Sequence, residues 1–411
     1  LSSSSAASDV YKRQGYDSAG IAISDGNKIT IEKKEGKLDV LKDHLKNNQM
    51  SGNVGIGHTR WATHGIPNDV NAHPHSDNNE EFAIIHNGII ENYAEIKKDL
   101  LKEGFEFKSD TDTEVVAVEL SRKWSGELLK TVVDVANSLE GTYALLVTTT
   151  KEEGTIVAGR LMSPLVLGVG DDEVFLASDS AAILEHTKKM IFLENGDFVE
   201  IKNGKYKLFD SDLNEIEREI QEIDWEVSEA EKSGYDHFMY KEILEQSEVI
   251  ERTISGRLDT NSDDIPIKSE HASKFEKIWI VACGTAYHAG LFGKDLFEKV
   301  LGVPVSVELA SEFRYREPIV GKNDLGIVIS QSGETMDTIA ATELLKENGS
   351  HVLALVNVVG SSLARMADSV FYLHVGPEIG VASTKAYLGM LVSQLIIAKH
   401  WDSKNLSLIH I

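Results

Sequence analysis

The residues best suited to chemistry in this sequence lie between Leu325 and Ala340. This segment reads LGIVISQSGETMDTIA, an apolar strand that ends in hydroxyls and a glycine and then becomes helical. Backbone N–H groups at a helix start lack intrahelical partners and carry the positive end of the helix dipole, so they bind anions. Ser330, Ser332 and Thr335 add neutral donors. Since neither the P-loop lysine nor a GxGxxG motif is present, the pattern predicts a phosphorylated metabolite as ligand.

Three polar segments in the first half also combine residue types that can do chemistry. They read HTRWATHG at 58–65, HNGIIEN at 86–92 and SDTDTE at 109–114. Taken singly, each has a structural explanation, because Asn87-Gly88 is most often a hairpin turn and Arg60 most often a surface ion pair. The aspartates of the third segment are, singly, helix caps. A function is therefore predicted only from the three segments together.

Five histidines raise the question of a metal site: His58, His64, His73, His75 and His86. No pair has the i, i+4 spacing of the helical H-E-x-x-H motif, and histidines are often hydrogen-bonded polar groups without a metal. We therefore predict no metal.

The composition limits the functional classes. A chain of 411 residues with 42% hydrophobic content is long enough for two or three soluble domains. The formal net charge of -25 disfavours nucleic acid and anionic membranes as partners, since binding either depends on clustered Lys and Arg. The single cysteine, Cys283, excludes an intrachain disulfide framework and suits the cytoplasm. The apolar stretch 388–398 is too short to span a bilayer.

The first half is predicted to be an α+β domain with antiparallel strands. Alternating apolar residues flank Asp25-Gly26 and Asn203-Gly204, pairs that tolerate the positive φ of tight hairpins. Asn92 and Thr111 each have a glutamate three residues later, which is the spacing of a capping box before a helix. Further strands are expected at 141–149, 154–159, 165–169 and 173–177.

The composition becomes charged and helical over 224–258, which predicts an interdomain connector. We expect its apolar residues to form one packing stripe, made of Phe238, Ile243, Leu244, Val249, Ile250 and Ile254. After it, strands and helices alternate, which predicts an α/β doubly wound, mainly parallel sheet. Ligands of such sheets bind beyond the carboxyl ends of the strands, where both 283–285 and 330–335 fall.

The motifs also resemble known families. The three first-half segments, in this order, closely resemble the glutaminase domain of the N-terminal-nucleophile amidotransferases, which has a four-layer αββα fold. The second half resembles a sugar isomerase (SIS) domain in four segments: ACGTA at 282–286, ASEFRY at 310–315, SQSGET at 330–335 and EIGVASTK at 378–385. The pair, over about residues 15 to 404, resembles the glutamine:fructose-6-phosphate amidotransferase family.

In the first half, the resemblance implies release of ammonia from glutamine by an N-terminal cysteine whose own α-amino group is the base. Asn87 and the Gly88 N–H would form the oxyanion hole. Arg60 would clamp the α-carboxylate of glutamine and Asp112 would bind its α-ammonium. The other implied glutamine-site residues are Trp61, at the ammonia channel, and Thr63 and His64 on the same loop.

In the second half, the resemblance implies a fructose 6-phosphate site and the synthesis of glucosamine 6-phosphate, an amino-sugar and cell-wall precursor, together with glutamate. The implied residues are Thr285, Ser330, Gln331, Ser332 and Thr335 for the phosphate, and Val381 and Ser383 for the sugar. The family needs no metal or organic cofactor, and it implies a homodimer through the isomerase half. Ala286 replaces a serine often found in the phosphate loop.

The predicted division is a non-native tail at 1–14, a class II glutamine amidotransferase domain at 15–223, the connector at 224–258, a SIS domain at 259–405 and a second tail at 406–411. The family nucleophile would lie upstream of Gly15, and the second half of the isomerase would lie beyond Ile411. We therefore expect an inactive fragment of a parent enzyme.

The alternative is a catalytically silent phosphosugar-binding protein. A glutamine-dependent phosphoribosyl transferase or an asparagine synthetase would need a diphosphate or ATP loop, which we do not find.

Overall fold

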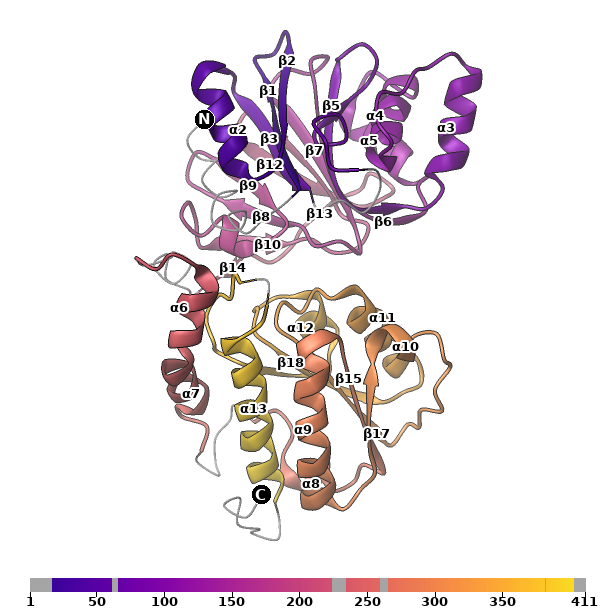
Figure 1. The fold of residues 1–411 in the computed structure, drawn as a ribbon. Helices are drawn as coiled ribbons and strands as arrows, with labels where there is room; N and C mark the ends of the chain where they lie inside the picture. The colour runs from indigo at the N-terminus through magenta and orange to yellow at the C-terminus, as the bar shows by residue number, and fades with distance from the viewer. Residues whose placement is uncertain (1–16, 61–65, 224–233, 259–264, 381, 403–411) are drawn as a thin grey trace. The chain divides into compact units, whose positions relative to one another are not determined.

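The structure is a computed structural model that describes residues 17–60, 66–223, 234–258, 265–380 and 382–402 (Figure 1). The chain separates into two compact units, Leu1–Val227 and Ser228–Ile411. The strands of the first unit pair antiparallel, and those of the second pair parallel. The finer division predicted from composition, with a separate connector, stays a prediction.

The first unit contains three sheets. The largest has the order β13-β12-β11-β7-β6-β5-β4, and the others have the orders β2-β1-β3 and β14-β10-β8-β9. The strands are β1 (Ser18–Ser24), β2 (Ile29–Glu35), β3 (Val54–Arg60), β4 (His75–Ser76), β5 (Phe82–Ile90), β6 (Gly141–Thr149), β7 (Thr155–Leu161), β8 (Val166–Val169), β9 (Val174–Ala177), β10 (Lys189–Phe192), β11 (Phe198–Lys202), β12 (Lys205–Phe209), β13 (Glu215–Ile216) and β14 (Gln221–Glu222). The four strands expected from 141 to 177 are thus confirmed.

Buried clusters show how these sheets are layered. Ile56 of β3 packs with Ile85 of β5, and Leu167 of β8 packs with Val199 of β11, so both smaller sheets face the large one. Helices cover the outer faces, in the four-layer αββα order that the resemblance implied. They are α2 (Leu38–Asn47) on the three-stranded sheet, α4 (Asp112–Arg122) and α5 (Leu128–Ala136) on the large sheet, and α3 (Tyr93–Lys102) against α4.

The local signals of the first unit are confirmed with one exception. Gly26 has a φ of 92° in the β1–β2 turn, and Asn203 and Gly204 have φ values of 52° and 72° between β11 and β12. Thr111 Oγ1 accepts a hydrogen bond from Glu114 N at 3.3 Å, as a cap should. The capping box at Asn92 is wrong, because its side chain bonds Ser138 and Glu140 instead of the helix it precedes.

The second unit contains one five-stranded sheet with the order β16-β15-β17-β18-β19, and every pair is parallel. The strands are β15 (Lys277–Ala282), β16 (Val305–Leu309), β17 (Asp324–Ser330), β18 (His351–Val356) and β19 (Ser369–Tyr372). The helices are α6 (Phe238–Leu244), α7 (Gln246–Ile254), α8 (Ser269–Ala272), α9 (Gly284–Leu301), α10 (Ala310–Phe313), α11 (Met336–Glu347), α12 (Ser362–Met366) and α13 (Lys385–Trp401). The predicted doubly wound sheet is confirmed.

The helices cover the two faces of this sheet separately. Alternate residues of β15 point to opposite faces, so Ile280 packs with α9 and α13 while Val281 packs with α10, α11 and α12. The strand order reverses between β15 and β17, and ligands bind at such a switch point in doubly wound sheets. Within the described ranges, no helix is long and apolar enough to cross a membrane.

The expected packing stripe of the connector is wrong in part. Phe238 and Val249 are buried, whereas Ile243, Leu244 and Ile250 are exposed on their own unit. The prediction placed the apolar residues of the whole segment on one stripe. The structure has two short helices, α6 and α7, that meet at a turn at Glu245, so a single helical periodicity does not run through both.

Candidate active site

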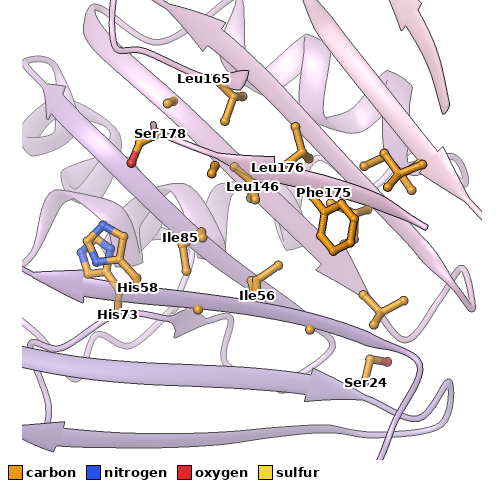
Figure 2. Close-up of a pocket in the computed structure, with 18 of the residues that line it drawn as sticks. Ser24, Ile56, His58, His73, Ile85, Leu146, Leu165, Phe175, Leu176 and Ser178 are labelled. Atoms are coloured by element: carbon orange, nitrogen blue, oxygen red, sulfur yellow. The ribbon is translucent and has the colours of Figure 1, made fainter. Parts of the chain in front are cut away.

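The polar segments of the first unit meet at a cavity of about 1010 Å³ between the large sheet and the two smaller ones. Its lining includes Arg60 at the end of β3, Asn87 and Gly88 in β5, and Asp112 at the start of α4. Figure 2 shows the stacked rings of His58 and His73 at one end and apolar side chains along the body. The labelled apolar residues are Ile56, Ile85, Leu146, Leu165, Phe175 and Leu176. The end of the cavity at Arg60, Asn87 and Asp112 is thus polar.

Arg60 and Asp112 belong to the same polar end. Both are buried, with 5% and 6% of their surfaces exposed. Burial lowers the pKa of Arg60, and the carboxylates of Asp112 and Asp17 oppose this shift, so the charges lie close enough to interact. Asp112 Oδ2 is fixed by accepting the Ile90 N–H at 2.9 Å. A fixed cation and a fixed anion side by side suit a zwitterionic amino acid.

Asn87-Gly88 lies inside strand β5, so the hairpin turn that this dipeptide usually indicates is not formed. Gly88 has a φ of +133°, and a Cβ there would lie 2.0 Å from the Thr142 carbonyl oxygen, so glycine is required. His58 Nε2 lies 2.7 Å from Asn87 Oδ1. Since an amide oxygen only accepts, His58 donates, and the orientation of the Asn87 amide is fixed with its N–H groups turned away from His58.

Burial disfavours a positive charge on three histidines around this end, His73, His75 and His86. Burial lowers the pKa values of His73 and His75 well below the usual value, and the positive charges nearby add to the effect. Burial also lowers the pKa of His86, against the opposing charge of Asp112. In the neutral ring, His86 Nε2 donates to the Thr142 carbonyl at 3.3 Å, and Nδ1 lies 3.0 Å from Thr113 Oγ1. These shifts disfavour the charged form of the three rings, whereas Arg60 supplies a buried guanidinium at this end.

Three predicted glutamine-site residues, Trp61, Thr63 and His64, lie outside the described residues. They follow Arg60 directly in the chain. Among the described residues, no group of three or more His, Cys, Asp or Glu side chains has the geometry to hold a metal ion.

The phosphate loop of the second unit, residues 330–335, connects β17 to α11 and is braced by its own hydroxyls. Gly333 N donates to Ser330 Oγ at 3.1 Å, Glu334 N donates to Ser332 Oγ at 3.2 Å, and the hydroxyls of Ser330 and Thr335 lie 3.2 Å apart. Ser332 and Thr335 are half-buried and do not face the core.

Gly333 is required in this loop for two reasons. Its φ is +69°, and a Cβ there would lie 2.1 Å from Ser361 Oγ. Two backbone hydrogen bonds complete the brace. Asn357 N, directly after β18, donates to Gln331 O at 3.1 Å, and Leu363 N of α12 donates to Gly333 O at 3.0 Å. The loop therefore has a fixed shape.

Two helix N-termini converge at the switch point. Ala282 of β15 pairs with Ile329 of β17, so α9 and α11 begin beside each other, and Thr338 of α11 contacts Cys283 Sγ at 4.0 Å. Both helices are long enough to present free N–H groups and a dipole to an anion. Thr285, in the first turn of α9, is exposed. The combination suits a phosphate monoester.

The predicted sugar residues lie on the segment before α13. Val381 lies outside the described residues. Ser383 is half-buried, and its hydroxyl oxygen has no hydrogen-bond partner among the described residues. Glu378 Oε1 accepts from Thr384 N at 2.8 Å and Ala386 N at 3.0 Å, so it caps α13 and shapes the loop.

Sequence reasoning missed Asn357, which connects the phosphate loop to this segment. Besides its backbone bond to Gln331, its amide donates to the Gly376 carbonyl at 2.7 Å and accepts from Val375 N at 3.0 Å. The available signal was its position directly after a buried strand, at the edge where ligands bind.

Comparisons with known proteins agree with this architecture. A glutamine amidotransferase domain model matches residues 42–233, and a SIS domain model matches residues 272–398. Glutamine–fructose-6-phosphate aminotransferases (isomerizing) from Clostridium acetobutylicum and Clostridium tetani are 47% and 48% identical over 388 and 392 residues. These alignments cover 93% and 94% of this chain and 64% of each relative. A solved C-terminal domain of glucosamine-fructose-6-phosphate aminotransferase from Francisella tularensis is 44% identical, covering 42% of this chain and 51% of that one, with a TM-score of 0.39.

The fold and the family matches thus define a glutamine amidotransferase domain followed by a SIS domain. Over more than nine tenths of its length, the chain is homologous to the glutamine–fructose-6-phosphate aminotransferase family, as its motifs predicted. The chain spans 64% of the length of these relatives.

Proposed function

We propose that this chain is part of an enzyme that transfers the amide nitrogen of glutamine to fructose 6-phosphate, giving glutamate and glucosamine 6-phosphate. One observation carries the proposal: a buried Arg60–Asp112 end of a cavity and a hydroxyl-lined phosphate loop occur in the same chain. The names of the relatives support the same pair of substrates.

In the first unit, we assign glutamine to the polar end of the cavity. Arg60 binds the α-carboxylate and Asp112 the α-ammonium, while Asn87 and the Gly88 N–H stabilise the oxyanion that forms during attack on the amide. The His58 bond supports this role, because a fixed amide pays no reorganisation cost in the transition state. Trp61, Thr63 and His64 complete the site.

In the second unit, we assign the phosphate of the sugar to 330–335 and Thr285 and the sugar to Ser383, and the family resemblance adds Val381 to the sugar residues. Ammonia adds to the ketose carbonyl with loss of water, and isomerisation gives the amino aldose. The unpartnered Ser383 hydroxyl supports a ligand at this place.

A second function is favoured by one observation. The chain has a single cysteine, Cys283, which lies in the second unit, so the described glutaminase cavity contains no thiol nucleophile. We therefore expect the 411-residue chain to bind glutamine and fructose 6-phosphate without releasing glutamate, as a catalytically silent phosphosugar-binding protein.

Titration by calorimetry tests the proposal. Glutamine and fructose 6-phosphate should each bind with one site per chain. Fructose 6-phosphate should increase the unfolding free energy of the second unit by RT ln(1 + [L]/Kd), so the melting temperature of this unit should rise. The controls are glutamate, which lacks the side-chain amide of glutamine, and glucose, which lacks the phosphate. Failure of both ligands to bind would falsify the proposal, and glutamate release by the pure chain would contradict the silent form.

The remaining expectations about partners are also proposals. We propose a cytoplasmic enzyme that forms a homodimer through its SIS half and needs no metal or organic cofactor, and we expect no nucleic acid or membrane partner. The net charge of -25 and the single cysteine support these expectations. Light scattering of the purified protein tests the dimer.

A further inference from the structure

A buried carboxylate of α6 holds the loop that carries the proposed sugar residues. Glu242 is 2% exposed, and its Oε1 accepts hydrogen bonds from Ile379 N at 2.6 Å and Gly380 N at 3.0 Å. Burial raises the pKa of Glu242, and these two N–H groups oppose the shift. Successive N–H groups that converge on one carboxylate fix the backbone at Ile379 and Gly380, a few residues before Ser383.

The loop is shaped to accept this carboxylate. A Cβ at Gly380 would lie 2.4 Å from Glu242 Oε2, so only glycine allows the loop to approach α6 this closely. Ion pairs add to this contact one turn further along. Lys385 Nζ lies 2.7 Å from Glu245 Oε2, and Lys241 Nζ lies 3.4 Å from Glu245 Oε1. Two helices distant in sequence, α6 and α13, are thus tied together at the loop.

The other end of the loop is tied to the phosphate site. The side-chain amide of Asn357 bonds both Val375 and Gly376, and its backbone N–H donates to the carbonyl of Gln331 in the phosphate loop. Residues 375–380 therefore have one anchor at the phosphate loop and one at Glu242. The phosphate loop, in contrast, is braced by its own hydroxyls.

We propose that Glu242 is a positioning residue that places the sugar-recognition loop against a phosphate site whose shape does not depend on it. The inference rests on the proposed function and deepens it, because it divides affinity for the substrate into two separable parts. The phosphate part depends on 330–335, and the sugar part depends on the α6 contact.

The test compares two ligands, fructose 6-phosphate and inorganic phosphate, by calorimetry. In Glu242→Gln, an amide N–H replaces one carboxylate oxygen and faces the loop N–H groups, so a donor meets donors. We expect fructose 6-phosphate to bind about tenfold more weakly, while the Kd of inorganic phosphate stays unchanged. Glu248→Gln, an exposed position of α7, is the matched control and should change neither Kd.

Gly380→Ala attacks the same contact from the loop side and should give the same selective loss. A merely structural role predicts an equal loss of both ligands together with a lower melting temperature, and that outcome overturns the inference, as does an unchanged ratio of the two Kd values. If the unmodified chain binds inorganic phosphate but not fructose 6-phosphate, the proposed function itself fails, and the inference fails with it.

Discussion

The two candidate sites differ in how they are assembled. The site of the first unit gathers Arg60, Asn87 and Asp112 from two strands of different sheets and one helix, and it depends on charged side chains that are buried. The site of the second unit is built largely from one segment, 330–335, with backbone N–H groups and neutral hydroxyls. The difference follows from the ligands: a zwitterion with an amide must be met at several points, whereas a phosphate needs a ring of donors.

This contrast has an energetic side. Buried ionised groups are costly unless their partners are in place, so the first site requires a protein interior that keeps the surrounding histidines neutral. Neutral donors at helix ends cost little when the site is empty. We therefore expect the first site to respond strongly to pH and charge, and the second to respond to backbone geometry.

The largest expected effect is acid destabilisation of the first unit. The folded pKa values of His73, His75 and His86 lie below the usual 6.5, so below pH 6.5 the unfolded chain binds protons that the folded chain does not. The unfolding free energy is therefore undiminished above pH 6.5. Below that pH it falls by about 1.4 kcal/mol per pH unit for each histidine. Denaturant melts between pH 7 and 5 measure the slope.

The variant His73→Gln sharpens this test. It removes one of the three buried rings, so its unfolding free energy should fall less steeply with decreasing pH, by about one proton. An identical slope in the variant and the unmodified chain would show that these histidines do not carry the effect.

Arg60→Ala should cause the largest loss of ligand affinity. It removes a buried cation and leaves Asp112 without its neighbouring charge, so glutamine should bind about a hundredfold more weakly. Fructose 6-phosphate affinity should not change, because that site lies in the other unit. Calorimetry with both ligands measures the effect, and Lys46→Ala, an exposed position, is the control. Equal losses for both ligands would break the comparison between the sites.

Gly333→Ala should damage the second site through the backbone. The alanine would have to adopt a backbone φ of +69°, and its Cβ would clash with Ser361 Oγ, so the phosphate loop must shift. We expect inorganic phosphate and fructose 6-phosphate to lose affinity together, by about tenfold. Gly302→Ala is a matched control, because it has a similar φ of +73° but no atom near the new Cβ. If both variants bind equally well, the fixed shape of the loop is unimportant.

Ser332→Ala should have the smallest effect. It removes one neutral hydroxyl, worth about 1 kcal/mol, so phosphate should bind about fivefold more weakly while glutamine binding is unchanged. Ser273→Ala, on an exposed turn of the same unit, is the control. A loss as large as that of Arg60→Ala would mean that the second site also depends on single side chains.

The same contrast explains what the sequence could predict. The phosphate loop, the hairpins and the Thr111 cap depend on neighbouring residues, and local patterns predict such features well. The meeting of Arg60 with Asp112 follows from strand pairing across sheets, so it was expected only through the family resemblance. The buried partners Asn357 and Glu242 escaped because a lone polar residue has no pattern, and the connector stripe was wrong because a turn at Glu245 breaks the helical period.

The contacts of α6 and α7 with the last elements of the second unit also constrain how this unit folds. Glu242 bonds Ile379 across 137 residues, Thr253 bonds Leu373 across 120, and α7 packs against α13 (Figure 1). During synthesis, the apolar residues that α6 and α7 bury in the folded unit, Phe238 and Val249, stay uncovered until α13 leaves the ribosome. Such long-range closure slows folding and leaves the nascent unit open to aggregation, so chaperone demand should fall on this half of the chain.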